Sequence, residues 1–195
     1  MKRKSKVINL ITIILMTLIG FSMLACDDVD NYLGTKGFAG TWHSQELIAI
    51  GEIDFNLVLY FDGNNIYQDG MYFPVADEYM WGFGGISGIG NRGKYSVKDG
   101  NLFLTPTHYH GSLLLMYADM WKNNPDYNDP DFKDDQWYNE SQIRQIGGLL
   151  FDYTANQLKN SVALSLPFVF NDANTITLTI TLSGGATEDR VFVKQ

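Results

Sequence analysis

The fold is decided by the stretch TITLTITL at residues 175–182, in which threonine alternates with isoleucine or leucine. Successive side chains of a β-strand point to opposite faces, so this stretch predicts a strand with one apolar and one polar face. Residues 162–168 alternate in the same way, and residues 171–174 (NDAN) between the two segments have the composition of a turn. The C-terminal part therefore predicts an antiparallel hairpin.

The same alternation continues through most of the chain from residue 40. Phe55 and Phe61 fall on the apolar face of a predicted strand, and Tyr95 falls on that of another strand, which leads into Asp99-Gly100, a strong hairpin signal. Phe168 lies on the apolar face of residues 162–168. Eight or nine strands joined mostly by short turns predict an all-β fold, an antiparallel up-and-down barrel whose closure removes exposed strand edges.

Two segments interrupt this rhythm. Residues 74–93 hold six glycines and predict a flexible loop or an irregular strand. Residues 111–154 form a longer interruption, with an apolar run at 113–121 that favours a short helix, a polar run rich in Asp, and a helical turn or two ending at Gly147. We therefore expect a barrel domain over residues 39–195 with a long, partly helical insertion at about 111–154.

The N-terminus has the pattern of an export signal. A cluster of four basic residues precedes residues 7–25, which carry no charge, and such a segment is expected to be a helical signal peptide. The apolar run is also long enough for an uncleaved transmembrane anchor, which is the alternative interpretation. The one cysteine of the chain, Cys26, follows directly.

Met23-Leu24-Ala25-Cys26 resembles the lipobox of bacterial lipoproteins, in a loose form similar to that of spirochaetes. The resemblance implies a signal peptide at 1–25 that is cleaved before Cys26, a diacylglyceryl group in thioether linkage to Cys26, usually an acyl chain such as palmitate on the new amine, and a lipidated tether at 26–38. Membrane attachment would place the protein in the cell envelope, on the periplasmic side or the outer surface. Because one acyl chain anchors a protein only marginally, two or three chains would be needed for firm attachment.

Charge excludes one class of partner. Removal of the four basic residues before Cys26 leaves 10 basic and 22 acidic residues, a formal charge of −12. Such a surface repels the phosphate backbone, so we predict no nucleic-acid binding.

A lone cysteine also excludes an intramolecular disulfide, so the domain must be stabilised by its core alone.

Gly40-Thr41-Trp42 resembles the G-x-W signature on the first strand of lipocalins, and Arg190 matches the arginine that packs over this tryptophan in that family. With the meander pattern and the lipobox, the chain is similar to small bacterial lipocalin-like lipoproteins. The resemblance implies a cation–π pair between Trp42 and Arg190 that closes one end of the barrel.

Candidates for metal binding and catalysis are weak. His108 and His110, two positions apart on a strand, would offer two imidazoles on one face, but we favour exposed polar residues over a metal site. The acidic loop at 126–135 lacks the EF-hand register, so a solvated loop is favoured over a calcium site. No serine lies in a nucleophile elbow. We predict no enzyme activity, no cofactor and no bound metal.

The remaining constellation is aromatic. Non-catalytic binding of a small apolar ligand in the barrel is the leading hypothesis, although inward residues of a small barrel can equally well fill it. The alternative function is a protein-interaction module, such as an inhibitor, adhesin or assembly factor, that acts through its loops. The candidate ligand-binding residues are Phe55, Phe61, Tyr95, Phe168, Trp81 and Trp121.

Overall fold

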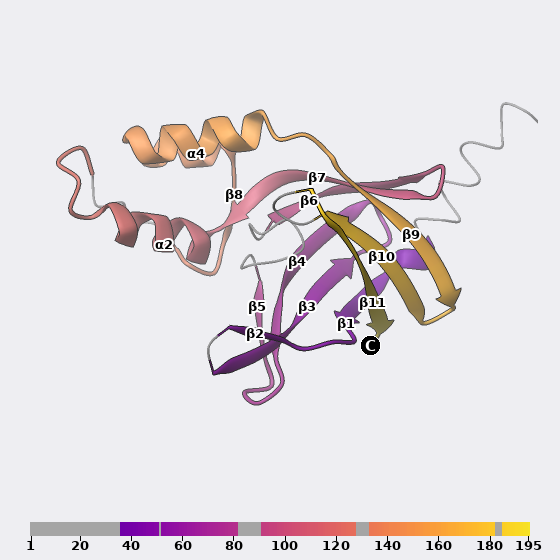
Figure 1. Cartoon of the computed structure of the whole chain (residues 1–195). Helices are drawn as coiled ribbons and strands as arrows, with labels where there is room; N and C mark the ends of the chain where they lie inside the picture. Colours follow the sequence, from indigo (N-terminus) through magenta and orange to yellow (C-terminus); the bar gives the residue numbers. More distant parts are fainter. Residues whose placement is uncertain (1–35, 51, 82–90, 128–132, 182–184) are drawn as a thin grey trace, which may run out of the picture.

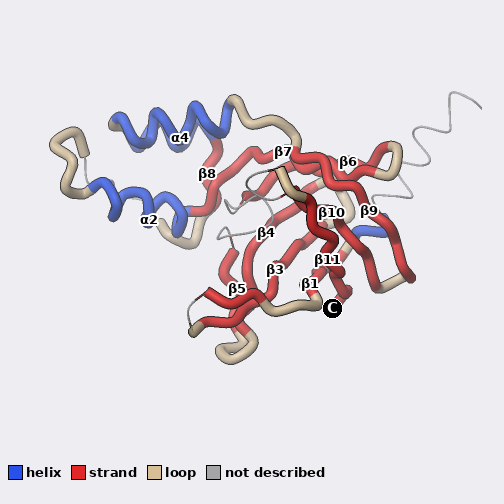
Figure 2. Tube along the Cα trace, viewed as in Figure 1, coloured by secondary structure: helices blue, strands red, loops and turns tan. Residues whose placement is uncertain are grey.

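The computed structural model describes residues 36–50, 52–81, 91–127, 133–181 and 185–195 (Figure 1). The predicted signal peptide, Cys26 and most of the tether lie outside the described residues. Strands dominate the described part, and all of them belong to one sheet (Figure 2). Among the residues that the structure describes, no helix combines the length and the apolar character needed to cross a membrane.

Eight strands close into an antiparallel barrel. Each strand pairs with the next barrel strand along the chain, and the last pairs with the first, as an up-and-down meander requires. The predicted barrel is therefore confirmed. The barrel strands are β1 (Gly40–Ser44), β3 (Ile53–Phe61), β4 (Ile66–Phe73), β6 (Asn91–Lys98), β7 (Asn101–His110), β9 (Leu164–Asp172), β10 (Thr175–Thr181) and β11 (Thr187–Lys194).

Three short strands extend the sheet outside the barrel: β2 (Ile48–Ile50) pairs with β3, β5 (Glu78–Trp81) with β4, and β8 (Trp137–Asn139) with β7. The β5 strand lies within the glycine-rich segment at 74–93, so part of that segment is regular structure. The Asp99-Gly100 hairpin is as predicted: both residues have positive φ, 50° and 71°, which suits a tight hairpin turn.

The alternating pattern of β10 fits its place in the barrel. Its isoleucine and leucine side chains are buried in the barrel core, and its threonines face outward; three of them are half-buried and Thr181 is exposed. Pro167 lies directly beyond Phe168↔Leu178, the last register pair between β9 and β10. A proline has no N–H to donate to a ladder, which agrees with the end of the β9–β10 pairing at this point.

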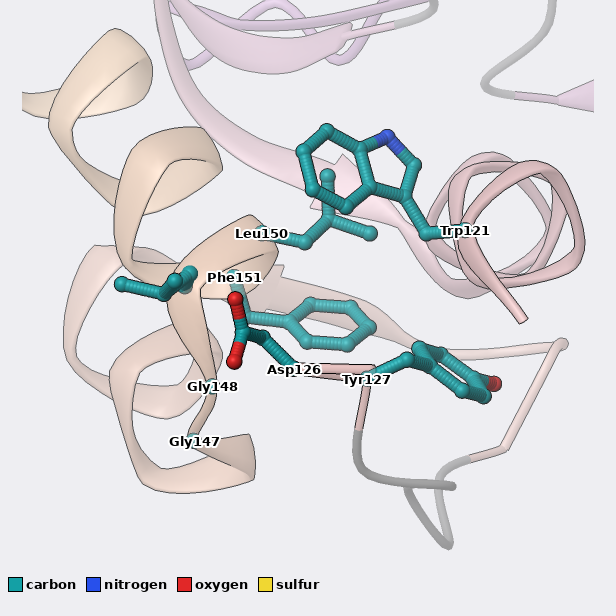
Figure 3. Close-up of a pocket in the computed structure, with 8 residues that line it drawn as sticks. Trp121, Asp126, Tyr127, Gly147, Gly148, Leu150 and Phe151 are labelled. Carbon is teal, nitrogen blue, oxygen red and sulfur yellow. The ribbon is translucent and has the colours of Figure 1, made fainter. Parts of the chain in front are cut away.

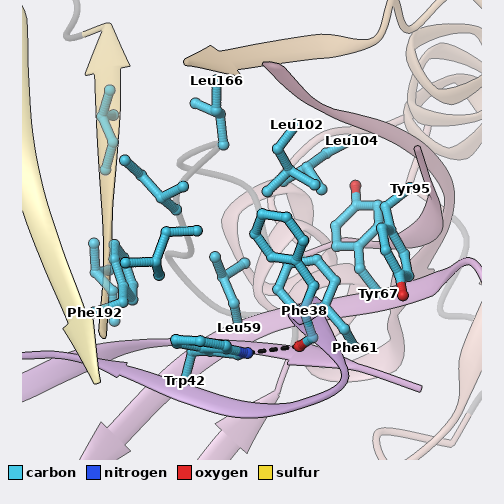
Figure 4. Packing of buried hydrophobic residues seen from close by; sticks show 14 of the residues in the cluster. Phe38, Trp42, Leu59, Phe61, Tyr67, Tyr95, Leu102, Leu104, Leu166 and Phe192 are labelled. Carbon is cyan, nitrogen blue, oxygen red and sulfur yellow. Dashed lines mark hydrogen bonds between the residues drawn. The ribbon is translucent and has the colours of Figure 1, made fainter. Parts of the chain in front are cut away.

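One end of the barrel is filled by aromatic side chains (Figure 4). Phe38, just before β1, is 1% exposed and contacts the rings of Phe61 and Phe168 at centroid distances of 5.3 and 5.0 Å. The indole N–H of Trp42 donates to the Phe38 carbonyl oxygen at 2.6 Å. This hydrogen bond holds the segment that enters the barrel against the first strand.

The cation over Trp42 is Lys194, whose Nζ lies 5.4 Å from the ring centroid. The β1–β11 register places Trp42 directly opposite Lys194. The lipocalin resemblance assigns Arg190 to this place. In the structure Arg190 lies four residues before Lys194 on β11, opposite Leu178 of β10, and its guanidinium pairs with the Glu188 carboxylate at 2.7 Å. A cation does cover the tryptophan, but it comes from a position four residues later on β11.

The insertion between β7 and β9 forms a separate helical layer, which consists of β8 and the helices α2 (Gly111–Trp121), α3 (Glu140–Ile146) and α4 (Leu149–Lys159). Figure 1 shows α2 and α4 projecting from the end of the barrel where β7 ends. The insertion runs to residue 163, beyond the predicted limit of 154, because α4 was not predicted. The layer has its own buried cluster, which includes Leu114, Ile143 and Phe151.

Candidate functional site

The six predicted ligand-binding residues do not form one site. Phe55, Phe61 and Tyr95 are buried in the barrel core, and Phe168 packs against that core. Trp81 lies on β5, which pairs with β4 outside the barrel, and Trp121 ends α2 in the helical layer. The structure therefore divides the predicted set among three places, since sequence alternation says which face a residue takes but not which strands and helices meet.

Within the barrel, the predicted residues pack against one another. The rings of Phe61 and Tyr95 meet edge to face at 4.8 Å, and those of Phe55 and Phe73 lie 6.0 Å apart. Burial, together with the nearby Asp62 carboxylate, raises the pKa of Tyr95 to about 12. These side chains form a packed core at the positions where the sequence predicted a ligand cavity.

A carboxylate is buried on the inner face of the barrel. Asp69 is 1% exposed and is paired in register with Leu59, a core residue. Its Oδ1 accepts the backbone N–H of Asn91, directly beyond Gln68↔Arg92, the last β4–β6 pair. Burial and the Asp69 charge raise the pKa of Tyr67, so its hydroxyl stays protonated. The carboxylate thus extends the contact between β4 and β6 where their ladder stops.

Outside the barrel, Trp81 belongs to a cluster with Tyr72, Tyr79 and His43. Tyr79 stacks on Trp81 at 5.5 Å, and Tyr72 lies 4.9 Å from Tyr79. His43 Nε2 lies 3.1 Å from the Tyr79 hydroxyl, and burial lowers the pKa of His43. The His43 ring is buried and lies 4.8 Å from the Tyr72 ring and 5.6 Å from the Tyr79 ring, so the cluster covers β1 at this point.

A cavity lies in the helical layer. A groove between α2 and α4, with a volume of about 330 Å³, is open to solvent along part of its length. No side chain that lines it carries a charge at neutral pH. We call it the α2–α4 groove; it is lined by Tyr109, Tyr117, Met120, Trp121, Leu150, Tyr153, Thr154 and Gln157.

Local sequence explains how α4 forms one wall of the groove. Leu150, Phe151, Thr154, Ala155 and Leu158 recur at helical spacing and are buried, which gives α4 a stripe that packs inward. The Thr154 hydroxyl donates to the Leu150 carbonyl at 2.9 Å, so it is satisfied within the helix.

At the rim, exposed side chains surround the groove opening. Met120 is 70% exposed, Tyr153 63% and Trp121 38%. Gln157 Nε2 donates to the Tyr153 hydroxyl at 2.6 Å and provides the polar group of the rim. The rim is therefore apolar and aromatic with one hydrogen-bonding pair.

A second, much smaller cavity lies beside this groove. Figure 3 shows Trp121 of α2 beside Leu150 of α4, with Tyr127 and Phe151 nearby. Its volume is about 10 Å³, and a cavity of this size holds at most about one water molecule. Trp121 and Leu150 line both cavities, so they form the wall between them.

The groove meets the barrel at the end of β7. Tyr109 is buried in the core of the helical layer, while its register partner Asn91 lies in the barrel. His110 follows and caps α2: its Nδ1 accepts the backbone N–H of Ser112 at 3.4 Å and lies 2.7 Å from the Ser112 hydroxyl. The His110 ring meets the Trp137 ring edge to face at 4.8 Å.

Both neighbouring histidines, His108 and His110, have hydrogen-bond partners inside the protein. His108 Nδ1 lies 2.8 Å from the Thr107 hydroxyl, and burial together with Arg92 lowers the pKa of His108. Within the described part of the chain, no three His, Cys, Asp or Glu side chains come together as a metal site would need. Of the acidic loop, residues 128–132 lie outside the described residues.

Sequence reasoning found one residue of the groove, Trp121, and missed the remainder. The missed residues are Tyr109, Tyr117, Met120, Leu150, Tyr153, Thr154 and Gln157. The available signal was the apolar recurrence within LLFDYTANQLK at 149–159, which has helical spacing.

Comparison with known proteins adds no assignment: no family model, no curated protein and no solved structure matches the chain. The closed eight-stranded barrel is therefore established by its strand pairing alone.

Proposed function

We propose that this chain is a lipocalin-like lipoprotein of the cell envelope, attached to a membrane by lipid on Cys26, which binds a small, uncharged apolar ligand without catalysis. The ligand site that the geometry supports best is the α2–α4 groove. The observation that carries this proposal is a groove of about 330 Å³ with four aromatic side chains and no charged group in its lining.

Volume and lining both suit a small ligand. Ligand pockets have volumes of about 300 to 1,000 Å³ and are lined mainly by apolar and aromatic groups with a few polar ones. The α2–α4 groove is at the lower end of this range. Because a buried charge without a partner is costly, the part of the ligand inside the groove must be uncharged. A hydroxyl or carbonyl group could bond to Gln157 and Tyr153 at the rim.

The barrel interior is the weaker candidate for the ligand site. The aromatic side chains assigned to ligand binding there are already in contact with one another. A ligand in that part of the barrel would have to displace packed side chains, at a cost of several kcal/mol.

The anchor is supported by the sequence and by the position of the first strand. The lipobox-like stretch ends at Cys26, and the barrel begins at Gly40. The intervening residues are polar enough to act as a tether, and an extended chain covers about 3.3 Å per residue. The tether would therefore hold the barrel within several tens of ångströms of the lipid surface.

Binding of a neutral fluorescent compound tests the groove. A chain of residues 27–195 retains every described strand and helix. It is titrated with N-phenyl-1-naphthylamine, whose fluorescence rises in apolar surroundings. Met120→Lys replaces an apolar side chain at the rim by a charged one and should weaken binding about fourfold or more, because the ligand loses apolar contact worth about 0.8 kcal/mol for each CH₂ group. The matched control is Val75→Lys, at a fully exposed position in the turn between β4 and β5. Equal affinity of the two variants would show that the compound binds elsewhere.

A protein partner is the second candidate function, favoured by the exposed Met120, Trp121 and Tyr153 around the groove. Large apolar side chains at a surface commonly mark a protein interface. Native mass spectrometry of the chain released from the envelope, followed by organic extraction, distinguishes the two. A small added mass that is lost on extraction supports the ligand; a clean mass of the chain alone argues against it.

A further inference from the structure

The joint between the barrel and the helical layer depends on a histidine cap. β7 ends at His110 and α2 begins at Gly111. The first N–H groups of a helix have no partner inside the helix, and the side chain before the helix commonly accepts one of them. Here the acceptor is the His110 Nδ1, which receives the Ser112 backbone N–H. Only an imidazole with an unprotonated Nδ1 can accept this bond.

Protonation would remove the cap and would also place a positive charge at the wrong end of the helix. A protonated imidazole carries hydrogen on both nitrogens and accepts no bond. The N-terminus of a helix is the positive end of its dipole, so a cation is unfavourable there. The first turn of α2 contains no acidic residue that would offset the charge. Both effects therefore destabilise the start of α2 in acid.

The groups around His110 set the pH at which this occurs. Its ring packs on Trp137 of β8 and on Ser112 of α2. The charges that face it come from Asp134 and Asp135, which favour the protonated form. Burial opposes them and has the larger effect, so the pKa of His110 is lowered from its ordinary value.

Two further groups lie close by. His108 is two residues earlier on the same face of β7, with Arg92 of β6 opposite it. The backbone carbonyl oxygen of Lys133 lies close to Gly111 at the start of α2: a Cβ atom added to Gly111 would be 2.1 Å from it. Neither group supplies an anion that would compensate a charged His110.

We propose that His110 is an acid-sensitive latch: its protonation opens the first turn of α2 and thereby loosens the α2–α4 groove. Tyr117, Met120 and Trp121 of α2 line the groove, so displacement of this helix changes the groove directly. The latch rests on the proposed function only in naming the groove as the ligand site. The dependence of α2 on His110 follows from the cap geometry alone.

Hydrogen exchange of the full-length chain in detergent tests the latch without any ligand. Exchange is measured by mass spectrometry between about pH 7.5 and about pH 5, with labelling times corrected for the intrinsic pH dependence. We expect the peptide over residues 111–121 to open about fivefold more in acid, the factor that corresponds to a cap worth about 1 kcal/mol. Peptides from β10 and β11 should change much less.

The decisive variant is His110→Asn, because asparagine caps helices well and does not titrate in this range. Its α2 should keep the same protection from neutral pH to acid. The matched control is His108→Asn, which removes the neighbouring histidine and should retain the acid-induced opening. A parallel NMR titration of His110 in the unaltered chain should give a midpoint below pH 6.5 that coincides with the opening.

Two results would overturn the latch: α2 exchange that does not change with pH, or the same opening in His110→Asn as in the unaltered chain. The NMR titration decides the matter if the variant fails to fold, since a midpoint that does not coincide with α2 opening also contradicts it. Opening of α2 in a chain that captures no apolar compound would refute the ligand site and leave the latch in place.

Discussion

Replacement of Gly111 by alanine sets two effects of opposite sign against each other. Gly111 is the first residue of α2, and alanine is the better helix former by about 1 kcal/mol. Propensity alone would therefore predict a more stable protein. The surroundings predict the reverse, because a Cβ at this position would lie 2.1 Å from the Lys133 carbonyl oxygen and 3.0 Å from the Asp134 Cα.

The size of the effect follows from these contacts. The Lys133 carbonyl belongs to the backbone and not to a flexible side chain. It would have to move away from the new Cβ by more than 1 Å to reach an ordinary contact distance of 3.4 Å. Overpacking of this kind costs about 1–3 kcal/mol. The movement also strains the bond from the Gly111 N–H to the Gln136 carbonyl, now 2.7 Å, and loss of such a bond costs about 1 kcal/mol. Net destabilisation of about 1–3 kcal/mol is expected after the gain in propensity is subtracted.

Chemical unfolding followed by circular dichroism gives the total change, and hydrogen exchange shows whether α2 is the part affected. Leu115→Ala is the control, because Leu115 lies in the same helix and is exposed. Its effect should be smaller, within about 0.5–1 kcal/mol. A Gly111→Ala variant as stable as the unaltered chain would refute the close packing of residues 133–136 against the start of α2.

Three further predictions concern the whole chain. Burial lowers the pKa of all three histidines, so the unfolded state takes up protons at a higher pH than the folded state does. The unfolding free energy should therefore be unaffected by the histidines above about pH 6.5 and should fall as the pH drops towards the folded-state pKa values. A urea midpoint that rises in acid would contradict this. Lys194→Met should lower the unfolding free energy by about 0.5–1 kcal/mol through loss of the cation over Trp42, measured by urea unfolding against Lys98→Met as an exposed control. Cys26→Ser should abolish labelling by a palmitate analogue and leave an uncleaved precursor; normal processing of this variant would exclude lipidation at Cys26.

The barrel could be predicted because its signal is local. Each strand alternates between the core and the outside, and this period of two is visible in β3 and β10 without any knowledge of their partners. Short turns such as Asp99-Gly100 then fix which strands are neighbours. The order of the meander follows from these two features, and closure follows from the need to pair the outer edges.

The helical layer was only partly predictable. The glycine stop of α3 was predicted, and Gly147 ends the helix with φ 83°; the capping box formed by Asn139 and Gln142 was not predicted. The α4 helix was missed although Leu150, Thr154 and Leu158 recur at helical spacing, since the Gly-Gly pair at 147–148 directly before it favours a loop. The groove itself depends on two helices that are far apart in sequence, and no local pattern determines how such helices lie against each other.

The position of the insertion explains how a fold of this size accommodates it. β7 and β9 pair with each other from Asn101↔Pro167 to Leu104↔Leu164, so the chain re-enters the sheet beside the strand from which it leaves. The entropy of closing a loop grows only slowly with loop length, by about 0.6 kcal/mol for each doubling. Burial of a separate apolar cluster, in which Leu114, Ile143 and Ala155 are fully buried, offsets this loss of entropy. Because this cluster is distinct from the barrel core, groove residues on α2 and α4 can change without disturbing the eight strands that support them. Variation of the proposed ligand surface on α2 and α4 is therefore decoupled from the stability of the barrel, and this is the physical reason to test the helical layer first.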